Sequence, residues 1–217
     1  NKGCEAWVAG SGLEGNTSLL LEAEKILPRY GMPVGSIEAT RNPKILFKTL
    51  KKFNIPFPTI SYTKRNSFYM GQWLRKDFST CGGMGIKKIF SSEMSEASFF
   101  QKKMEGIPVS ASIISNGKSG ILIGFCKITN FSYKNFPFLY SGVIGPINLS
   151  NFIERKIKKY ISILIKEVYL VGFFGVDFLL KKNSIYLLEI NPRPTASLEI
   201  LEKNYVNSLF DLHCESI

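Results

Sequence analysis

The feature that most constrains the fold is the stretch at residues 171–199, VGFFGVDFLLKKNSIYLLEINPRPTASLE. Its two apolar runs, residues 171–180 and 185–190, are rich in β-branched and aromatic side chains, and the polar residues 181–184 separate them. Short runs of this kind joined by a few polar residues predict an antiparallel β-hairpin.

This hairpin places three oxygen-bearing side chains together. With a loop centred on Asn183, Asp177 lies opposite Glu189 on the ladder, close enough for both carboxylates to reach one ion. Asn191 follows two residues after Glu189 and shares its face while the strand continues. Two carboxylates and an amide oxygen are suitable ligands for Mg²⁺, which takes its remaining ligands from water and substrate phosphates. Arg193 follows directly after the proline that ends the strand.

Two interpretations of this hairpin stay open on these residues alone. One is an ordinary hairpin with Asp177 and Glu189 on its solvent face. The other is a metal site. Two observations count against the ordinary hairpin: both acids sit in almost wholly apolar runs, where an unpaired acid is costly, and opposed like charges repel unless a cation lies between them.

The segments GVDFLL and LLEINPRPTAS resemble the C-terminal signature of the ATP-grasp superfamily. Within it, NPRPTASLEILEKNYVNSLFDLH most resembles ATP-dependent carboligases related to biotin carboxylase, a group similar to the tyramine–glutamate ligases of methanofuran-type cofactor synthesis. The resemblance implies that Asp177, Glu189 and Asn191 hold Mg²⁺, with Mn²⁺ as an alternative. It also implies that Arg193 is a catalytic residue that stabilises phosphoryl or acyl-phosphate charge. Many such ligases carry an arginine where this chain has Gly175.

A glycine-rich loop at residues 79–85 lies between the predicted strands 72–76 and 86–90. Glycines let backbone N–H groups approach phosphates closely, although neither the Walker A pattern nor GxGxxG is present. The loop resembles the mobile flap that covers the nucleotide in ATP-grasp enzymes, in which the preceding strand lysine, here Lys76, binds the α- and β-phosphates. On the residues alone, a plain flexible turn is equally consistent. The glycines assigned to ATP by this resemblance are Gly82, Gly83 and Gly85.

Residues 98–106, SFFQKKMEG, match in position the ATP-grasp hinge that holds adenine by its backbone. The resemblance therefore assigns Gln101, Lys103 and Met104 to adenine. Pro108 stands where the family often has an acid for the ribose, and residues 101–102 stand where Glu-Glu is common.

An amphipathic helix is predicted at residues 42–53, because apolar residues recur at helical spacing with lysines between them and Pro43 suits the first turn. It resembles the first helix of the ATP-grasp domain, which usually opens with Asp-Lys and which implies that Lys44 binds phosphate. Lys48 is a rival for that role, and a solvated lysine face accounts for either lysine equally well.

The N-terminal residues 5–10 predict a short strand that runs into a glycine-rich turn at residues 11–15. A helix capped by Asn16 or Thr17 then extends to about residue 27. This pattern, together with GSGLEG, resembles part of the N-terminal domain of the carboligase group. We therefore expect residues 1–40 to be the remnant of an α/β domain, with sequence missing upstream.

The remaining segments predict one pocket loop and several regular elements. Residues 131–149 are aromatic and glycine-rich and predict a loop that lines a pocket. A core helix is predicted at residues 152–170 with Ser150 as its cap. The other expectations are a hairpin of residues 111–115 and 121–128, a final helix through residue 201 capped by Thr195 or Ser197, and a structural role for the single histidine, His213.

Composition excludes several classes of protein. Hydrophobic residues make up 45% and charged residues 21% of the 217, which is typical of a globular protein, and no apolar run is long enough to span a membrane. Four scattered cysteines predict neither a disulfide framework nor a zinc site and favour a cytoplasmic location. A net charge of +11 fits a basic nucleic-acid-binding protein or an anionic substrate such as ATP. Because the lysines are dispersed and no nucleic-acid motif accompanies them, ATP is favoured.

Together these patterns predict an α/β ATP-grasp fold at residues 41–217, with a nucleotide flap subdomain at about 59–105 and a metal and phosphate subdomain at about 106–217. The activity that the resemblance implies is ATP-dependent ligation of a small-molecule carboxylate to an amine through an acyl phosphate, in cofactor biosynthesis. The alternatives are a nucleotide-binding module without catalysis and the basic nucleic-acid-binding protein. The expected partners are ATP, the carboxylate and the amine, without membrane or nucleic acid, and a homodimer stays open.

Overall fold

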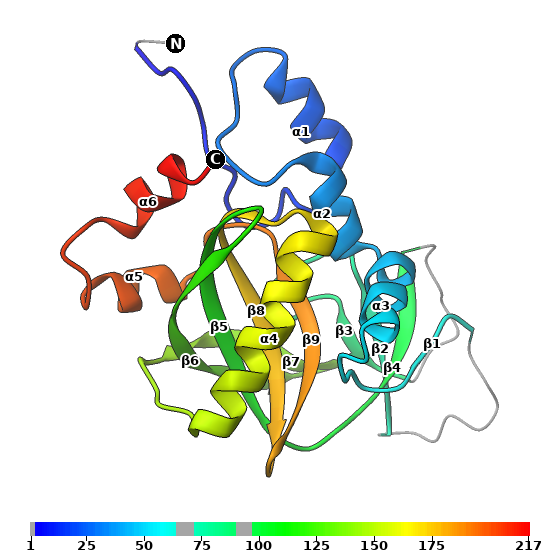
Figure 1. Ribbon diagram of the computed structural model, residues 1–217. Coiled ribbons are helices and arrows are strands. Elements are labelled where there is room, and N and C mark those ends of the chain that lie inside the picture. The colour runs from blue at the N-terminus through cyan, green and yellow to red at the C-terminus, as the bar shows by residue number, and fades with distance from the viewer. Residues whose placement is uncertain (1–2, 64–71, 90–96) are drawn as a thin grey trace.

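The computed structural model describes residues 3–63, 72–89 and 97–217, which form an α/β fold with two antiparallel sheets (Figure 1). The α/β class predicted from the sequence is confirmed. The helices are α1 (Thr17–Glu24), α2 (Val34–Arg41), α3 (Pro43–Lys52), α4 (Asn151–Val168), α5 (Ser197–Glu202) and α6 (Leu209–Glu215). The strands are β1 (Ile60–Ser61), β2 (Trp73–Asp77), β3 (Ile86–Lys88), β4 (Ser98–Lys102), β5 (Ile107–Asn116), β6 (Gly120–Tyr133), β7 (Phe136–Ile144), β8 (Val171–Lys181) and β9 (Ser184–Asn191).

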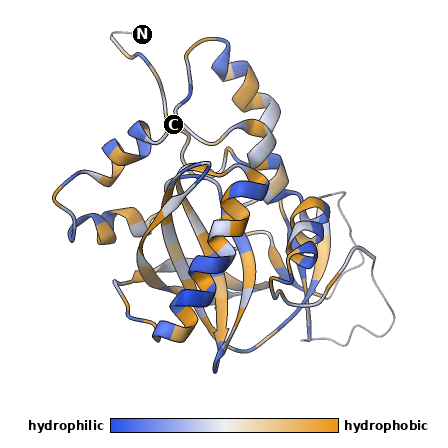
Figure 2. Ribbon diagram, viewed as in Figure 1, coloured by the Kyte–Doolittle hydropathy of each residue, from blue (hydrophilic) through white to orange (hydrophobic). Residues whose placement is uncertain are grey.

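The smaller sheet has four strands in the order β1-β4-β2-β3 and packs against α3. The predicted helix at residues 42–53 is α3, with Pro43 in its first turn as expected, and the Asn42 side chain caps it by accepting a hydrogen bond from the Lys44 N–H. Its apolar face is buried, with the Phe47 ring 4.9 Å from Phe57 and 5.7 Å from Phe99 of β4, whereas its lysines are exposed. Hydrophobic and hydrophilic residues accordingly alternate along the α3 ribbon (Figure 2). Burial of this aromatic cluster fixes the helix against the sheet.

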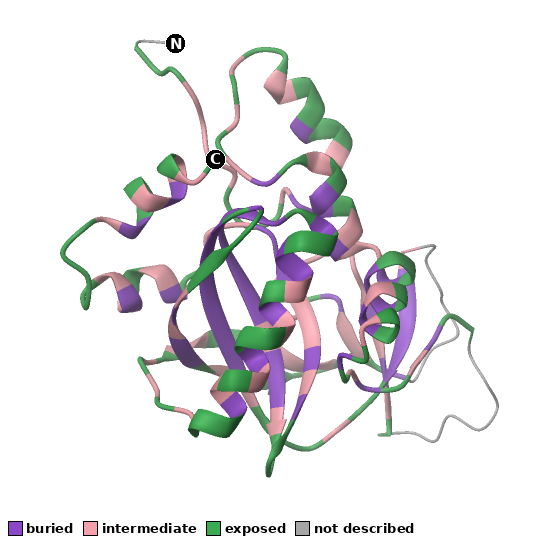
Figure 3. Ribbon diagram, in the orientation of Figure 1, coloured by how far each residue is buried: buried purple, intermediate pink, exposed green. Residues whose placement is uncertain are grey.

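The larger sheet has five strands in the order β7-β6-β5-β8-β9, and α4 lies across one of its faces (Figure 1). Ser150 caps α4 by accepting a hydrogen bond from the Ile153 N–H, as predicted. Six apolar residues that recur at helical spacing along α4 are all buried, together with much of β5 and β8 (Figure 3). They are Ile153, Ile157, Ile161, Leu164, Ile165 and Val168. This helix and sheet therefore form the main core.

The β8–β9 hairpin pairs Asp177 with Glu189, as predicted, although its loop is not centred where the sequence suggested. The loop is the two-residue turn Lys182-Asn183, with a positive φ of 53° at Lys182, and this shifts the register near the turn by one residue. A β-bulge at Leu188 of β9, between the pairs Phe178–Leu187 and Asp177–Glu189, restores the predicted pairing. A bulge of this kind cannot be read from alternation alone.

Three predictions of local structure are wrong. In the described residues 5–10 there is no regular strand, only an isolated parallel bridge between Trp7 and Arg29. Most of residues 131–149 is strand rather than loop, because β6 continues to Tyr133 and β7 pairs with it along the edge of the sheet. The helix predicted to be final, α5, begins after Ala196, which makes no side-chain capping bond, and α6 follows it.

Both α1 and β3 correspond to elements predicted from the sequence. Asn16 caps α1 as predicted, but α1 ends at Glu24, before the predicted residue 27. The predicted strand at residues 86–90 appears as β3, and Phe90 lies outside the described residues. Among the described helices, none is long and apolar enough to cross a membrane.

Candidate active site between the two sheets

The hairpin carboxylates converge with Asn191, as the sequence predicted. One oxygen of Asp177, Oδ1, accepts a hydrogen bond from the Ser110 hydroxyl at 2.7 Å, and the other, Oδ2, accepts one from the Asn191 amide at 3.0 Å. Ser110 lies directly opposite Asp177 on β5, and Glu189 lies opposite it on β9. Adjacent strand pairings therefore hold the three oxygen-bearing side chains at one place on the sheet.

The electrostatics of this cluster fit a cation. Burial, together with the charge of Glu189, raises the pKa of Asp177 to about 7, although hydrogen bonds from Ser110 and Asn191 and the charge of Lys76 act in the opposite direction. A carboxyl group in this state loses its proton readily when a divalent cation binds, because the cation offsets both the cost of burying the charge and the repulsion from Glu189 that raised the pKa. Two carboxylates and an amide oxygen are the donor set that Mg²⁺ accepts.

Lys76 brings the smaller sheet to this cluster. Its side chain is only 10% exposed, and its Nζ lies 3.8 Å from Oε2 of Glu189, whose side chain is 40% exposed. Alternation along β2 buries Leu74 and Lys76 on the same face, which points toward the larger sheet. A buried ammonium beside a carboxylate, at the edge of a cavity, can bind a phosphate.

The glycine loop at residues 79–85 rests on β7. The Tyr140 N–H donates a hydrogen bond to the Gly82 carbonyl at 3.0 Å. Gly83 has a φ of +78°, and a Cβ there would overlap the backbone carbonyl of Phe138. Only glycine fits such a contact, and in this position Gly82 and Gly83 line the space between the sheets.

The segment after β4 forms the opposite wall. Gln101, the fourth residue of β4, is only 3% exposed, and within the described part of the chain its Nε2 has no hydrogen-bond partner. Lys103 and Met104 follow, and the Lys103 N–H donates to the Gln72 carbonyl at 2.8 Å. A buried amide without a partner, facing a cavity, is suited to a polar ligand.

These elements enclose a cavity of about 780 Å³, which lies in the range of small-molecule sites. Ten residues that the sequence analysis assigned to ligands line it: Lys76, Gly82, Gly83, Gln101, Lys103, Met104, Asp177, Glu189, Asn191 and Arg193. Two assigned residues do not line it. Lys44 is exposed on α3, and Gly85 is buried behind the loop against Asp77 and Thr80. Lys48, the rival of Lys44, is also exposed.

The sequence alone did not identify two residues that contribute contacts to the site, Arg41 and Glu14. Arg41, the last residue of α2, donates hydrogen bonds from Nη2 to the carbonyls of Phe78 and Thr80, at 2.6 and 2.7 Å, and so holds the base of the glycine loop. Glu14 forms a buried ion pair with Arg193 at 2.9 Å. Neither residue belongs to a local pattern that reports its distant partner.

Gly175 packs closely against the Thr195 side chain. A Cβ on Gly175 would lie 2.9 Å from the Thr195 Cγ2, so a larger side chain there would require the Thr195 side chain to shift. Among the described residues, Arg193 is the arginine that lines the cavity.

Comparisons with known proteins show what the chain is similar to. The sequence profile of the ATP-grasp domain matches residues 42–197. The chain is 29% identical over 178 residues to an uncharacterized protein of Methanocaldococcus jannaschii, covering 75% of this chain and 44% of that protein. It is 27% identical over 106 residues to a formate-dependent phosphoribosylglycinamide formyltransferase of Wolinella succinogenes, covering 48% of this chain and 26% of that protein. The chain thus spans less than half the length of these curated relatives.

Among solved structures, the biotin carboxylase domain of the Hydrogenobacter thermophilus 2-oxoglutarate carboxylase, a dimer in complex with MgADP, ADP and bicarbonate, superposes with a TM-score of 0.78. The identity is 16%, and the alignment covers 99% of this chain and 54% of that chain. This likeness confirms the predicted fold, and the profile match confirms the predicted superfamily.

Proposed function

We propose that this chain, which belongs to the ATP-grasp domain family, is an ADP-forming ligase that joins a small-molecule carboxylate to an amine. The observation that carries the proposal is the convergence of Asp177, Glu189 and Lys76 at the wall of one cavity. The curated relative from Wolinella succinogenes is named as a formyltransferase that depends on formate, a carboxylate, which supports this class of substrate.

The residues of the chain divide the work of phosphoryl transfer, which consists mainly of positioning and charge compensation. Lys76 and the loop carrying Gly82 and Gly83 would hold the phosphates of ATP. Gln101 and the residues after it would hold the base. Asp177, Glu189 and Asn191 would hold Mg²⁺, which supplies compensation of phosphate charge when bound. Arg193 would stabilise the transferred phosphoryl group.

In the proposed reaction, an oxygen of the substrate carboxylate attacks the γ-phosphorus, and the bond to the β,γ-bridging oxygen breaks to release ADP. The amine nitrogen then attacks the carbonyl carbon of the acyl phosphate, loses a proton and expels inorganic phosphate. The cavity of about 780 Å³ leaves space beyond a nucleotide base for the substrates, and Arg193 lines it together with Asp177 and Glu189.

The first test is ATP binding by calorimetry, with and without Mg²⁺, for the natural chain and for the double variant Glu189→Gln with Asn191→Ala. We expect Mg²⁺-dependent binding to be lost in the double variant and retained in Glu167→Gln, whose carboxylate pairs with Lys52 outside the cavity. Release of ADP with carboxylate and amine pairs is then measured. A folded natural chain that does not bind ATP would refute the proposal.

The same test separates the proposal from a nucleotide-binding module without catalysis. The observation in favour of that alternative is Gly175, which stands where many ATP-grasp ligases carry an arginine. Tight MgATP binding without ADP release from any carboxylate and amine pair would support the module and contradict the ligase.

A further inference from the structure

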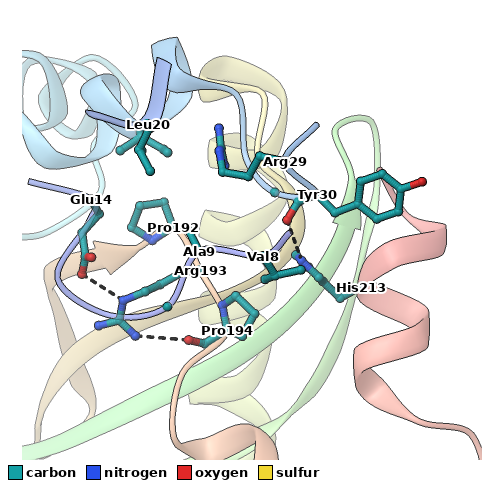
Figure 4. A pocket seen from close by; sticks show the side chains of 13 residues that line it. Val8, Ala9, Glu14, Leu20, Arg29, Tyr30, Pro192, Arg193, Pro194 and His213 are labelled. Carbon is teal, nitrogen blue, oxygen red and sulfur yellow. Dashed lines mark hydrogen bonds and ion pairs between the residues drawn. The ribbon is translucent and has the colours of Figure 1, made fainter. Parts of the chain in front are cut away.

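The N-terminal turn at residues 10–15 contributes a buried carboxylate to the site. The Glu14 side chain is only 4% exposed, and its Oε1 accepts a hydrogen bond from Nε of Arg193 at 2.9 Å (Figure 4). The Arg193 side chain is itself 13% exposed. The two residues are 179 positions apart in the chain, so this contact connects the N-terminal turn to the segment that follows the β8–β9 hairpin.

A second hydrogen bond fixes the Glu14 carboxylate within its own turn. Its second oxygen, Oε2, accepts a hydrogen bond from the Gly12 N–H at 2.6 Å within the same turn. Burial alone would raise the pKa of this carboxyl, but the Arg193 charge and the hydrogen bonds together hold the pKa below its ordinary value. The group is therefore a carboxylate at neutral pH.

The rest of the Arg193 guanidinium is directed to the cavity side. Nη1 donates to the Pro194 carbonyl at 3.2 Å, and the Arg193 N–H donates to the Asn191 carbonyl at 2.8 Å. Across residues 3–63, 72–89 and 97–217, Nη2 has no hydrogen bond to the protein, and Arg193 lines the large cavity. Glu14 occupies one edge of the planar fork and leaves another edge for an anion, which is how arginine binds phosphate with defined geometry.

We propose that Glu14 is a positioning residue, which holds the Arg193 guanidinium so that its free N–H groups face the phosphoryl group being transferred. This inference rests on the proposed ligase function. The physical reason is that an arginine side chain has many rotamers, and fixing one before the reaction removes that entropic cost from the transition state. The N-terminal turn, whose Ser11 also lines the cavity, is then part of the catalytic unit.

The chain contains a matched control for this ion pair. Glu24 accepts a hydrogen bond from Nε of Arg29 at 2.7 Å, and the Arg29 side chain is 4% exposed. This second pair lies in the same N-terminal region, and neither of its residues lines the large cavity. Breaking it therefore perturbs the region without touching Arg193.

The experiment measures kcat and KM for ADP release together with the Kd for MgATP, in the natural chain and in Glu14→Ala, Glu14→Gln and Glu24→Gln. We expect Glu14→Ala to lower kcat by about 100-fold, because a small misplacement of a positioned group has an effect of this size. We expect Kd to change by less than about twofold, because the base and the other phosphate contacts are unchanged. Glu14→Gln should fall between Glu14→Ala and the natural chain, since a glutamine oxygen still accepts from Nε.

Thermal unfolding establishes that each variant is folded, and Glu14→Gln carries the test where Glu14→Ala does not fold. A kcat for Glu14→Ala within about twofold of that of Glu24→Gln would overturn the inference. An equal loss in kcat for Glu14→Ala and Glu14→Gln would overturn it as well. If Glu14→Ala weakened MgATP binding by the same factor by which it lowered kcat, this would also overturn the inference, because Glu14 would then act in nucleotide binding. If the natural chain itself releases no ADP, the ligase proposal has failed, and this outcome is distinct from a silent Glu14 variant.

Discussion

Replacing Gly83 with alanine should weaken MgATP binding more than the same replacement at its neighbour Gly82. Both glycines have positive φ angles, 63° at Gly82 and 78° at Gly83, so alanine carries a similar conformational cost of about 1–2 kcal/mol at either position. They differ in their surroundings. A Cβ at Gly82 has no heavy atom within 4 Å, whereas a Cβ at Gly83 would overlap the Phe138 carbonyl.

The magnitude of the difference follows from that overlap. Backbone atoms cannot swing away as a side chain does, so the loop must move from β7 and stretch the hydrogen bond from the Tyr140 N–H to the Gly82 carbonyl. Forced overpacking of this kind costs about 1–3 kcal/mol. The free protein can relieve the strain by opening the loop, but a complex that needs the closed loop cannot, so the cost appears in the binding free energy.

Calorimetry with MgATP measures this difference directly. We expect the Kd of Gly83→Ala to exceed that of Gly82→Ala by about 5- to 150-fold, which corresponds to the 1–3 kcal/mol above. Denaturant unfolding of both variants checks that the fold is intact. Equal Kd values for the two variants, or a Gly83→Ala value within about twofold of the natural chain, would refute the inference that nucleotide binding needs the loop in its position against β7.

Two further predictions concern pH and stability. Mg²⁺ should bind with release of a proton, because the pKa of Asp177 is raised to about 7 and the metal binds only the carboxylate. The apparent affinity for Mg²⁺ should rise about tenfold per pH unit up to about pH 7 and then level off. Calorimetry in two buffers of different ionisation enthalpy can measure the proton release. An affinity that does not change with pH below neutral would contradict this prediction. Replacing His213 with alanine should lower the free energy of unfolding by about 1–3 kcal/mol, because the buried Phe173 N–H loses the imidazole acceptor at 2.8 Å. Burial lowers the pKa of His213, so the unfolded chain takes up the proton first and this contribution to stability is lost as pH falls below about 6.5. Denaturant titration measures both effects, and a loss of MgATP binding by a folded His213→Ala variant would contradict the purely structural role.

Local patterns were sufficient to predict the elements that lie on one hairpin or one helix. The expected hairpin places Asp177 opposite Glu189 with Asn191 on the same strand, and the structure shows this arrangement, although the pairing depends on a bulge in β9 that the sequence did not predict. The spacing of apolar residues likewise predicts which face of α4 is buried. These features depend on contacts between residues close in sequence, so the order of the side chains carries the information.

Longer-range packing was not readable in this way. Residues 131–149 contain the glycines and aromatic residues of a loop, but pairing with β6 makes most of the segment an edge strand. Tertiary hydrogen bonding overrides weak local preference there, since every backbone N–H that leaves water needs an acceptor.

The sequence by itself therefore determined the superfamily, the core and the identity of the carboxylate cluster. Only the tertiary structure decided which other side chains reach that cluster. Lys76 lies 3.8 Å from Glu189 because two separate sheets face each other, and Glu14 meets Arg193 because the N-terminal turn folds back over 179 positions. An ion pair of this kind leaves no period in the sequence, since the attraction depends on the distance in space and on burial from water, and both arise only when the chain is packed.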